Sequence, residues 1–530
     1  MSLLHMKKIM NFRPFVLFAL SLILGICLAT FIFVTENLKL VFLILFSLMF
    51  VCSVILTVVF KARFLKYLTT CLFLVVISVG YMFNFHHKVN SVMKYNDSDV
   101  LITGRICSNY KTTESGKLGL ILDDVTILNE DNETEIDGKI QIYVSSENFD
   151  LEGLKVGRFI SALGTIYVND FNDKFGYSLS SLSNKIYASC FVSYQTFRFD
   201  DEFDISVDEK IRVNIYERLK SYDLDYADIG YGMLFGDSSM IDGDIVSAFR
   251  TTGIAHILAV SGLHVSIVAM LVSFALRLFK CSKKTNVIIM AIILLGYCYL
   301  CDFSVSVVRA SLMTLIFLYM KARGKCYDRL SALAFAACVI LVVCPIKLFN
   351  ISFVLSFMAV LSIILLTDVF ESLFDKCFHK KMSGTLALIF AVQVGLVFVQ
   401  LYFFKKYTPL SIVCNFISIP VSVFAFNLMI FGLIFSFLPF MSFVLLGFDY
   451  LMGLVVKFNY TLSKIGLAFA TNNLSFLIVI FGAIVIVLLS NYIFIRKRYK
   501  VVGVSLLMGL STILLVLWQK WTRQTSVTLL

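Results

Sequence analysis

Charged side chains are scarce in this sequence, and long apolar runs fill most of it. Only 15% of the 530 residues are charged, whereas 59% are hydrophobic. Proline is nearly absent, with five residues, while phenylalanine is unusually abundant, with 52. A composition this apolar excludes an ordinary soluble domain and predicts a polytopic membrane protein.

The sequence also lacks a phosphate-binding loop. Its three Gly-Lys pairs are followed by Leu118, Ile140 and Cys326 rather than by the Ser or Thr that such a loop needs. We therefore expect no bound cofactor and no nucleotide hydrolysis by the chain itself. Any directional transport would have to draw on another protein or on an ion gradient.

The formal net charge of +11 has a simple explanation. Most of the surplus Lys and Arg residues stand in short loops between apolar runs, such as 321–325 and 496–500. Membrane proteins concentrate these residues in their cytoplasmic loops. The charge therefore says little about whether the protein binds a nucleic acid.

About thirteen runs are long and apolar enough to be transmembrane helices. The basic loops between them place the N-terminus in the cytoplasm and the C-terminus outside. The expected spans are 15–34, 41–60, 68–83, 253–277, 286–301, 305–320, 331–344, 351–369, 386–404, 411–438, 443–456, 474–495 and 501–518.

The segment 88–204 has a different character, because Asn, Asp, Ser and Glu become frequent and short alternating runs replace the long ones. Five strands are predicted, at 100–106, 118–126, 138–144, 158–166 and 185–191. Five short strands suit a small β-barrel of the OB type, and a sandwich fragment is the alternative. The predicted topology makes this domain extracytoplasmic.

Two roles are open for this β domain. OB folds bind single strands through basic grooves and aromatic platforms, and Tyr110, Tyr143, Tyr167 and Tyr187 are candidates for stacking on bases. Acidic residues outnumber basic ones between residues 97 and 200, however. This balance favours a scaffold role.

Cysteines are concentrated in the apolar spans and short loops. Of the thirteen, only Cys107 and Cys190 lie in the β domain. If the domain faces an oxidising exterior, these two are expected to form a disulfide. The Cys298 and Cys301 pair lies in an apolar run, where packing is the simpler role.

The region 205–252 is too charged to span a membrane, and Tyr216, Leu219, Tyr222 and Tyr226 recur in it at helical spacing. We expect it to lie along the outer membrane face. The predicted organisation is N-terminal helices (1–87), an OB-like β domain (88–204), an amphipathic surface region (205–252), a transmembrane domain (253–518) and a short extracytoplasmic tail (519–530).

The stretch 253–265 reads GIAHILAVSGLHV and places polar groups in an apolar run. Such groups are costly in a membrane and need a partner or a function. On an unbroken helix, His256, Ser261 and His264 would share a sector of about 140°. If Gly262 breaks the helix instead, the freed backbone groups must line a cavity.

Arg309 lies several residues inside a later span. Its planar donors suit a phosphate or a carboxylate, and Asp302 or Asp237 could be its structural ion-pair partner. A hydrolytic Ser261–His264 pair is disfavoured, because no Gly-x-Ser-x-Gly elbow surrounds the serine. A zinc site at His256 and His264 lacks a third ligand nearby.

The segment from Phe235-Gly-Asp237-Ser through Phe249-Arg and GIAHILAVSGLHV resembles the signature of the ComEC family of competence DNA-uptake channels. Three later stretches resemble further blocks of that family in the same order, namely SVVRASLM at 306–313, Cys344-Pro with Phe353-Val-Leu-Ser-Phe, and Pro409-Leu with NFISIP at 415–420. The resemblance covers nearly the whole chain, including the N-terminal helices and the OB-like domain.

The resemblance implies a channel in the bacterial cytoplasmic membrane that passes one DNA strand inward during transformation. The implied partners are single-stranded DNA, a cytoplasmic motor ATPase or helicase, a surface DNA receptor, a separate nuclease, the lipid bilayer and a second copy of the chain. The implied path residues are Asp237, Gly253, His256, Ser261, Gly262, His264, Arg309 and Asn415.

Many members of the family continue into a metallo-β-lactamase-like domain that is proposed to degrade the other strand. The present sequence contains no His-x-His-x-Asp-His cluster, so nuclease activity is not carried over and the chain is not expected to be an enzyme. A permease for a small polar solute and, less favoured, an intramembrane serine hydrolase are the rival hypotheses.

Overall fold

A computed structural model describes the chain at residues 13–34, 48, 50–51, 53–55, 63–112, 117–129, 132–145, 153–169, 177–376, 378–465, 469–470 and 482. The chain divides into two compact units. The larger unit comprises Phe12–Val354 and Ile417–Gly466, and the smaller comprises Met1–Asn11, Leu355–Phe416 and Leu467–Leu530.

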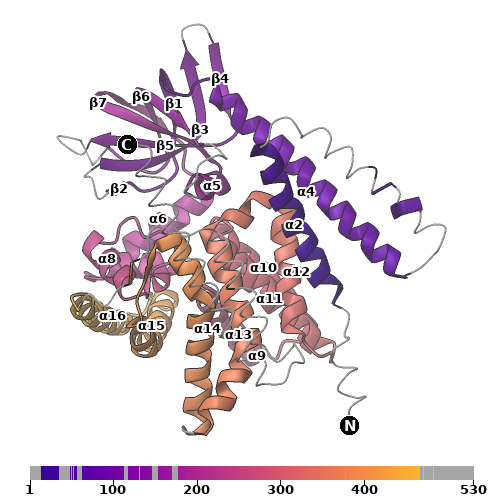
Figure 1. Cartoon of the computed structure of the whole chain (residues 1–530). Coiled ribbons are helices and arrows are strands. Elements are labelled where there is room, and N and C mark those ends of the chain that lie inside the picture. The colour runs from indigo at the N-terminus through magenta and orange to yellow at the C-terminus, as the bar shows by residue number, and fades with distance from the viewer. Residues whose placement is uncertain are drawn as a thin grey trace. The chain divides into compact units, whose positions relative to one another are not determined.

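The β domain belongs to the larger unit and is a closed barrel (Figure 1). Its strands are β1 (Ser98–Ile106), β3 (Lys117–Asn129), β5 (Lys139–Ser145), β6 (Arg158–Val168) and β7 (Ile186–Phe203). The ring runs β1-β3-β5-β7-β6 and returns to β1, with β5 and β7 parallel and the other neighbours antiparallel. The five predicted strands and the small barrel are confirmed.

Alternating side chains fill the interior of the barrel. Ile102, Ile127, Ile142 and Cys190 have no exposed surface, and every second residue of β6 from Ile160 to Ile166 is buried. Short strands β2 (Lys111–Thr112) and β4 (Asn132–Ile136) pair with β3, and helix α5 (Tyr177–Ser183) precedes β7. The period-2 pattern in the sequence thus reflects one face turned to a common core.

Two long helices precede the barrel. Helix α2 (Pro14–Val34) packs beside α4 (Arg63–Met93), and α4 leads directly into β1 (Figure 1). Most of the expected span 41–60 lies outside the described residues. The same holds for the expected spans 474–495 and 501–518 and for the tail 519–530.

Three short helices follow the barrel, namely α6 (Val207–Lys220), α7 (Ala227–Phe235) and α8 (Gly243–Thr251). Seven of the nine residues of α7 are buried. Protein rather than a membrane surface therefore surrounds α7. The prediction that the region 205–252 lies along a membrane face therefore does not fit α7. It fits α6 better, because Val207 and Ile211 of that helix are exposed.

The rest of the larger unit is helical. In chain order it contains η2 (Ala255–Ile257), α9 (Gly262–Leu278), α10 (Lys283–Leu300), α11 (Val305–Ala322), α12 (Arg329–Val343), η3 (Pro345–Phe349), most of α15 (Ser411–Ile434) and α16 (Met441–Ser463). Helices α9, α10 and α11 enclose an apolar cluster that includes Val265, Leu294 and Val307.

The smaller unit contains a helical hairpin formed by α13 (Ile351–Phe374) from Leu355 onward and by α14 (Lys380–Phe404). Leu365, Leu366 and Ala391 form its buried contact. Beyond α14, strand β8 (Lys406–Tyr407) pairs with β9 (Phe469–Ala470). Buried Gln393 donates a hydrogen bond to Ser411 in the first turn of α15.

Eight of the described helical segments are long and apolar enough to cross a membrane. Each coincides with an expected span, and α2 and α12 contain shorter apolar helices, Pro14–Thr30 and Arg329–Val343. A polytopic membrane protein with an inserted small barrel is therefore the fold class. The expected total of about thirteen spans stays a prediction, because three of them fall largely on residues that the structure does not describe.

Candidate functional site

The polar stretch 253–265 is not an unbroken helix, because residues 258–261 separate η2 from α9, which begins at Gly262. Gly253, with φ +76°, lies in the left-handed region just after α8, and His256 lies in the short 3-10 helix η2. Ser261 is extended and caps the N-terminus of α9, which begins at Gly262. The common face that an unbroken helix would give to His256, Ser261 and His264 is therefore not formed, since only His264 lies within α9.

Ser261 and His264 satisfy each other's backbone in a capping box. The Ser261 hydroxyl accepts from the Leu263 N–H at 3.3 Å, and His264 Nδ1 accepts from the Ser261 N–H at 3.1 Å. The orphan donors at a helix start are stabilised in this way. Because Nδ1 is engaged by the backbone, it cannot serve as a free general base for the hydroxyl 3.5 Å away.

Gly262 lies directly beside Arg309. A Cβ atom built at Gly262 would stand 2.9 Å from Arg309 Nη2 and 3.5 Å from the Cβ of Ala310. Arg309 is 6% exposed and projects from the second turn of α11. The absence of a side chain at Gly262 therefore lets the guanidinium approach the start of α9.

Phe426 of α15 covers the other side of the capping box. Its ring centroid lies 4.4 Å from that of His264, and Phe426 has no exposed surface, while His264 is 3% exposed. The structure thus brings Ser261, Gly262, His264 and Arg309 together in a buried cluster, which we name the capping cluster. His256 lies in η2, before the cap, and interacts electrostatically with His264.

The two carboxylates predicted as partners of Arg309 pair elsewhere. Asp302 accepts from Arg212 of α6 at 2.9 and 3.4 Å, and Asp237 accepts from Asn109 at 3.0 Å. Asn415 lies near the start of α15, in the smaller unit, whereas the capping cluster belongs to the larger unit.

Asp237 belongs instead to a charged seam between one end of the barrel and the helices. The barrel contributes Arg105 and Asn109, and α6 contributes Glu209 and Arg212. Asp237 follows the short helix α7, and Asp302 stands in the turn between α10 and α11. Arg105 Nη1 lies 3.3 Å from Glu209 Oε2, and Arg212 also contacts Asp208 at 2.5 Å. A cavity of about 50 Å³ lies within the seam, lined in part by Cys107, Tyr216 and Tyr231.

Electrostatic interactions keep both Arg212 and Asp208 in their charged forms. Burial opposes the charge on Arg212, but the Asp302 and Asp208 carboxylates outweigh it and raise the guanidinium pKa. Burial would likewise raise the pKa of Asp208, but the Ser206 hydroxyl and Arg212 together lower it. Sequence reasoning missed this seam, although Asp208 and Arg212 carry the i, i+4 spacing of a helical ion pair.

The predicted disulfide between Cys107 and Cys190 is absent, and both residues are free thiols. Cys107 follows β1 and Cys190 lies in β7, and these strands are not neighbours in the ring. Adjacent strands are about 4.8 Å apart, so strands with another strand between them exceed the roughly 7 Å that a disulfide tolerates between Cα atoms. Burial raises the thiol pKa to about 11 for Cys107 and about 12 for Cys190, so both stay protonated.

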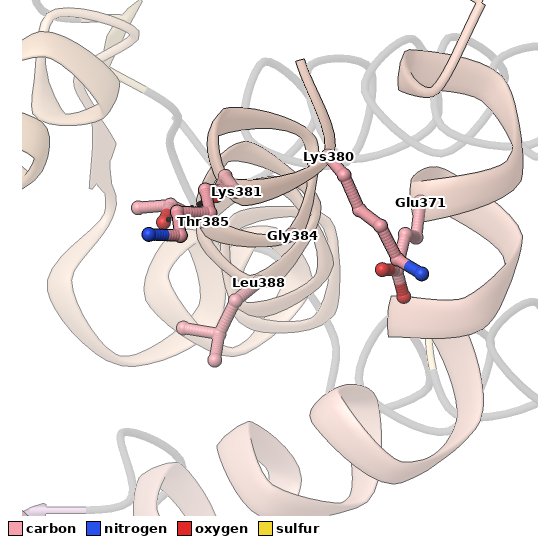
Figure 2. Close-up of a pocket in the computed structure, with 6 residues that line it drawn as sticks. All are labelled: Glu371, Lys380, Lys381, Gly384, Thr385 and Leu388. Atoms are coloured by element: carbon pink, nitrogen blue, oxygen red, sulfur yellow. Dashed lines mark hydrogen bonds between the residues drawn. The ribbon is translucent and has the colours of Figure 1, made fainter. Parts of the chain in front are cut away.

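An open hollow on the α13–α14 hairpin is a weaker candidate site (Figure 2). Lys380 and Glu371 extend toward one another there, while Lys381 and Thr385 lie on the other side of α14. Both signs of charge are present on an open surface. The hollow therefore does not select a ligand of one charge.

A barrel inserted among apolar helices defines a polytopic membrane protein, and the buried cluster of Arg, His, Ser and Gly is its candidate functional site. The family model described as Competence protein matches residues 233–496, about half of the chain, and this segment includes the capping cluster. The chain belongs to the ComEC family of competence proteins.

Two curated relatives share part of this chain. ComE operon protein 3 of Bacillus subtilis (strain 168) is 28% identical over 202 residues, which are 38% of this chain and 25% of that protein. An uncharacterized protein of Aquifex aeolicus (strain VF5) is 32% identical over 144 residues, 27% of this chain and 34% of that protein. The chain therefore matches between a quarter and a third of each relative's length. No solved structure matches it.

Proposed function

We propose that the protein is a channel of the bacterial cytoplasmic membrane that admits one strand of DNA during natural transformation. The observation that carries the proposal is the capping cluster, in which a buried Arg309 stands against Gly262 within the segment shared with competence proteins. A guanidinium kept at membrane depth is a costly feature that function explains better than stability.

The chemistry of the capping cluster suits a moving polyanion. Arg309 supplies planar donors for phosphate oxygens, and Ser261 and His264 fix the helix start beside it. Contacts along such a path must be weak and numerous, since one tight site would stall the strand. Phosphate contacts carry no base information, so we expect no sequence preference.

The barrel would stand on the outer side of the membrane, with the N-terminus in the cytoplasm and the C-terminus outside. Its ring order, with the third and fifth strands parallel, supports an OB fold. A cytoplasmic motor would pull the strand, a surface receptor would deliver it, and a separate nuclease would degrade the other strand. The chain itself would act without catalysis, in the bilayer and together with a second copy.

The test is uptake of fluorescent DNA into the cytoplasm of a competent host whose own copy is replaced by variants. Arg309→Glu should abolish uptake, Arg309→Lys should retain part of it, and membrane fractions should contain equal amounts of each protein. Normal uptake by the Arg309→Glu variant would show that Arg309 has only a structural role. Normal uptake after complete deletion would overturn the channel and favour a transporter of small polar solutes.

A further inference from the structure

Three aromatic rings lie together on the outward face of the barrel wall. Tyr143 of β5 stacks on Phe191 of β7, with ring centroids 5.3 Å apart and planes inclined by 18°. Tyr167 of β6 meets the same phenylalanine at 5.7 Å and 70°. Phe191 is 41% exposed and Tyr167 is 46% exposed. Single exposed apolar side chains are common, but a contiguous group of rings marks a binding surface.

The strands themselves fix the positions of these rings. Cys190, the residue before Phe191, has no exposed surface and points into the barrel, so Phe191 points outward. Tyr143 is in register with Phe191 across β5 and β7, and Tyr167 is in register with Ser189 across β7 and β6. The three rings therefore stand on neighbouring strands of a closed sheet, which holds a binding surface more precisely than loops do.

Charge is distributed unevenly around the rings. Lys117 of β3 is exposed and places its ammonium 4.8 Å from the centroid of the Phe191 ring. On the other side, Thr165 of β6 is in register with both Phe191 and Asp99, and its hydroxyl donates to the Asp99 carboxylate at 2.5 Å. Positive charge thus borders the rings toward β3 and negative charge borders them toward β1. An anionic chain would lie with its backbone on the β3 side.

This group includes two of the four tyrosines that the sequence suggested for stacking on bases. Tyr143 and Tyr167 belong to it, whereas Tyr187 is 3% exposed and packs against Phe85 of α4 at 5.8 Å. The central ring, Phe191, was missed, because sequence reasoning considered tyrosines alone. Only the fold shows which of the aromatic residues share a surface.

We propose that Tyr143, Phe191 and Tyr167 form a stacking platform for the unpaired bases of single-stranded DNA, with Lys117 as its phosphate contact. Bases stack on exposed aromatic rings without regard to sequence, and a duplex hides the base faces that such rings need. In OB folds, oligonucleotides bind on the face of the second and third strands. In this barrel those strands are β3 and β5, which carry Lys117 and Tyr143.

The platform rests on the proposed channel for its purpose, and it names the part of the strand that the barrel recognises. A base that stacks on Phe191 replaces the Lys117 ammonium there, and the long lysine side chain turns to the adjoining phosphate. With this lysine as its phosphate contact, the platform should depend weakly on salt. We expect a slope of about −0.7 in a plot of log affinity against log salt concentration, the value for one phosphate contact on a single strand.

The test uses the full chain in lipid nanodiscs and the fluorescence anisotropy of a short labelled oligothymidine. An abasic strand of the same length keeps the phosphates but lacks the bases, so it should bind about tenfold more weakly. Phe191→Leu keeps an apolar side chain but removes the ring. It should weaken oligothymidine binding about tenfold and leave the abasic strand unaffected, whereas Phe191→Tyr should retain the affinity of the parent.

A matched control is Phe203→Leu. Phe203 also lies in β7, is 47% exposed and has a cation beside its ring, since the Arg158 guanidinium lies 5.9 Å from the centroid. This variant should bind oligothymidine as the parent does, and both leucine variants should keep the parent Tm. Equal oligothymidine affinities in the parent and in Phe191→Leu would overturn the platform and leave lipid or another protein as the partner of the rings. Equal affinities for the oligothymidine and the abasic strand would overturn it too.

Binding and uptake can fail independently. If oligothymidine binding depends on Phe191 but deletion of the chain leaves DNA uptake normal, the platform is retained and the channel is overturned. If deletion abolishes uptake but Phe191→Leu binds as the parent does, the channel is retained and the platform is overturned.

Discussion

The capping cluster and the charged seam both place polar groups among helices, but they satisfy those groups in opposite ways. Ser261 and His264 are bonded to backbone within three residues of each other. In the seam, Arg212 finds Asp302, 90 residues away in the sequence and with a side chain that is 73% exposed. Local bonding fixes a geometry through folding of one helix end, whereas pairing between elements can be released without unfolding either.

The largest expected effect comes from filling the space beside Arg309. Gly262→Leu would place a side chain where a Cβ already meets Nη2 at 2.9 Å, and overpacking of this kind costs about 1–3 kcal/mol. The control is Gly296→Leu in α10, because nothing lies within 4 Å of a Cβ built there. Thermal unfolding in detergent should show a lower Tm for Gly262→Leu alone, and equal Tm values would contradict a fixed cluster.

The capping box gives the next largest effect. Ser261→Ala should cost about 1 kcal/mol of stability, the usual value of a lost N-cap. Ser261→Asn should recover most of it, because asparagine caps helices equally well but cannot act as a nucleophile. If DNA uptake falls and recovers together with stability across these variants, the role of Ser261 is that of a helix cap. Loss of uptake in a fully stable Ser261→Asn protein would revive the hydrolase hypothesis.

Sequence reasoning succeeded where the structure depends on a short-range period. The barrel strands were predicted because residues such as Ile140 and Ile142 alternate with less buried neighbours and point to one core. The apolar helices were found for a similar reason. The ComEC resemblance was recognisable from contiguous blocks of residues that the family model also covers.

Sequence reasoning failed where a residue's partner depends on tertiary contacts. Asp302 stands seven residues before Arg309 and was a reasonable partner for it, yet it pairs with Arg212. Cys107 and Cys190 share a domain but not adjacent strands. The start of α9 was missed because a Ser-Gly pair in an apolar run fits either a continuous or a broken helix, and only the capping hydrogen bonds distinguish a beginning.

Acid should weaken the charged seam. The pKa of Asp208 is lowered below its ordinary 3.8, so its stabilisation is complete above that value and is lost as the pH falls through the folded-state pKa. We expect about 1 kcal/mol or less from this partly exposed network. Unfolding measured from pH 6 to 3 should show this loss in the parent and a smaller one in Arg212→Gln. Identical profiles would show that the Asp208–Arg212 pair does not stabilise the fold.

The smallest expected effect is at Cys107. As a free thiol whose Sγ contacts the Ile121 carbonyl at 3.4 Å, it should tolerate Cys107→Ser within about 0.5 kcal/mol. Loss of a disulfide would instead cost about 2–5 kcal/mol. Electrophoresis of the chain purified from membranes, with and without reductant, should show one mobility. A shift on reduction that disappears in Cys107→Ser would instead establish the disulfide and would show that this end of the barrel is held covalently.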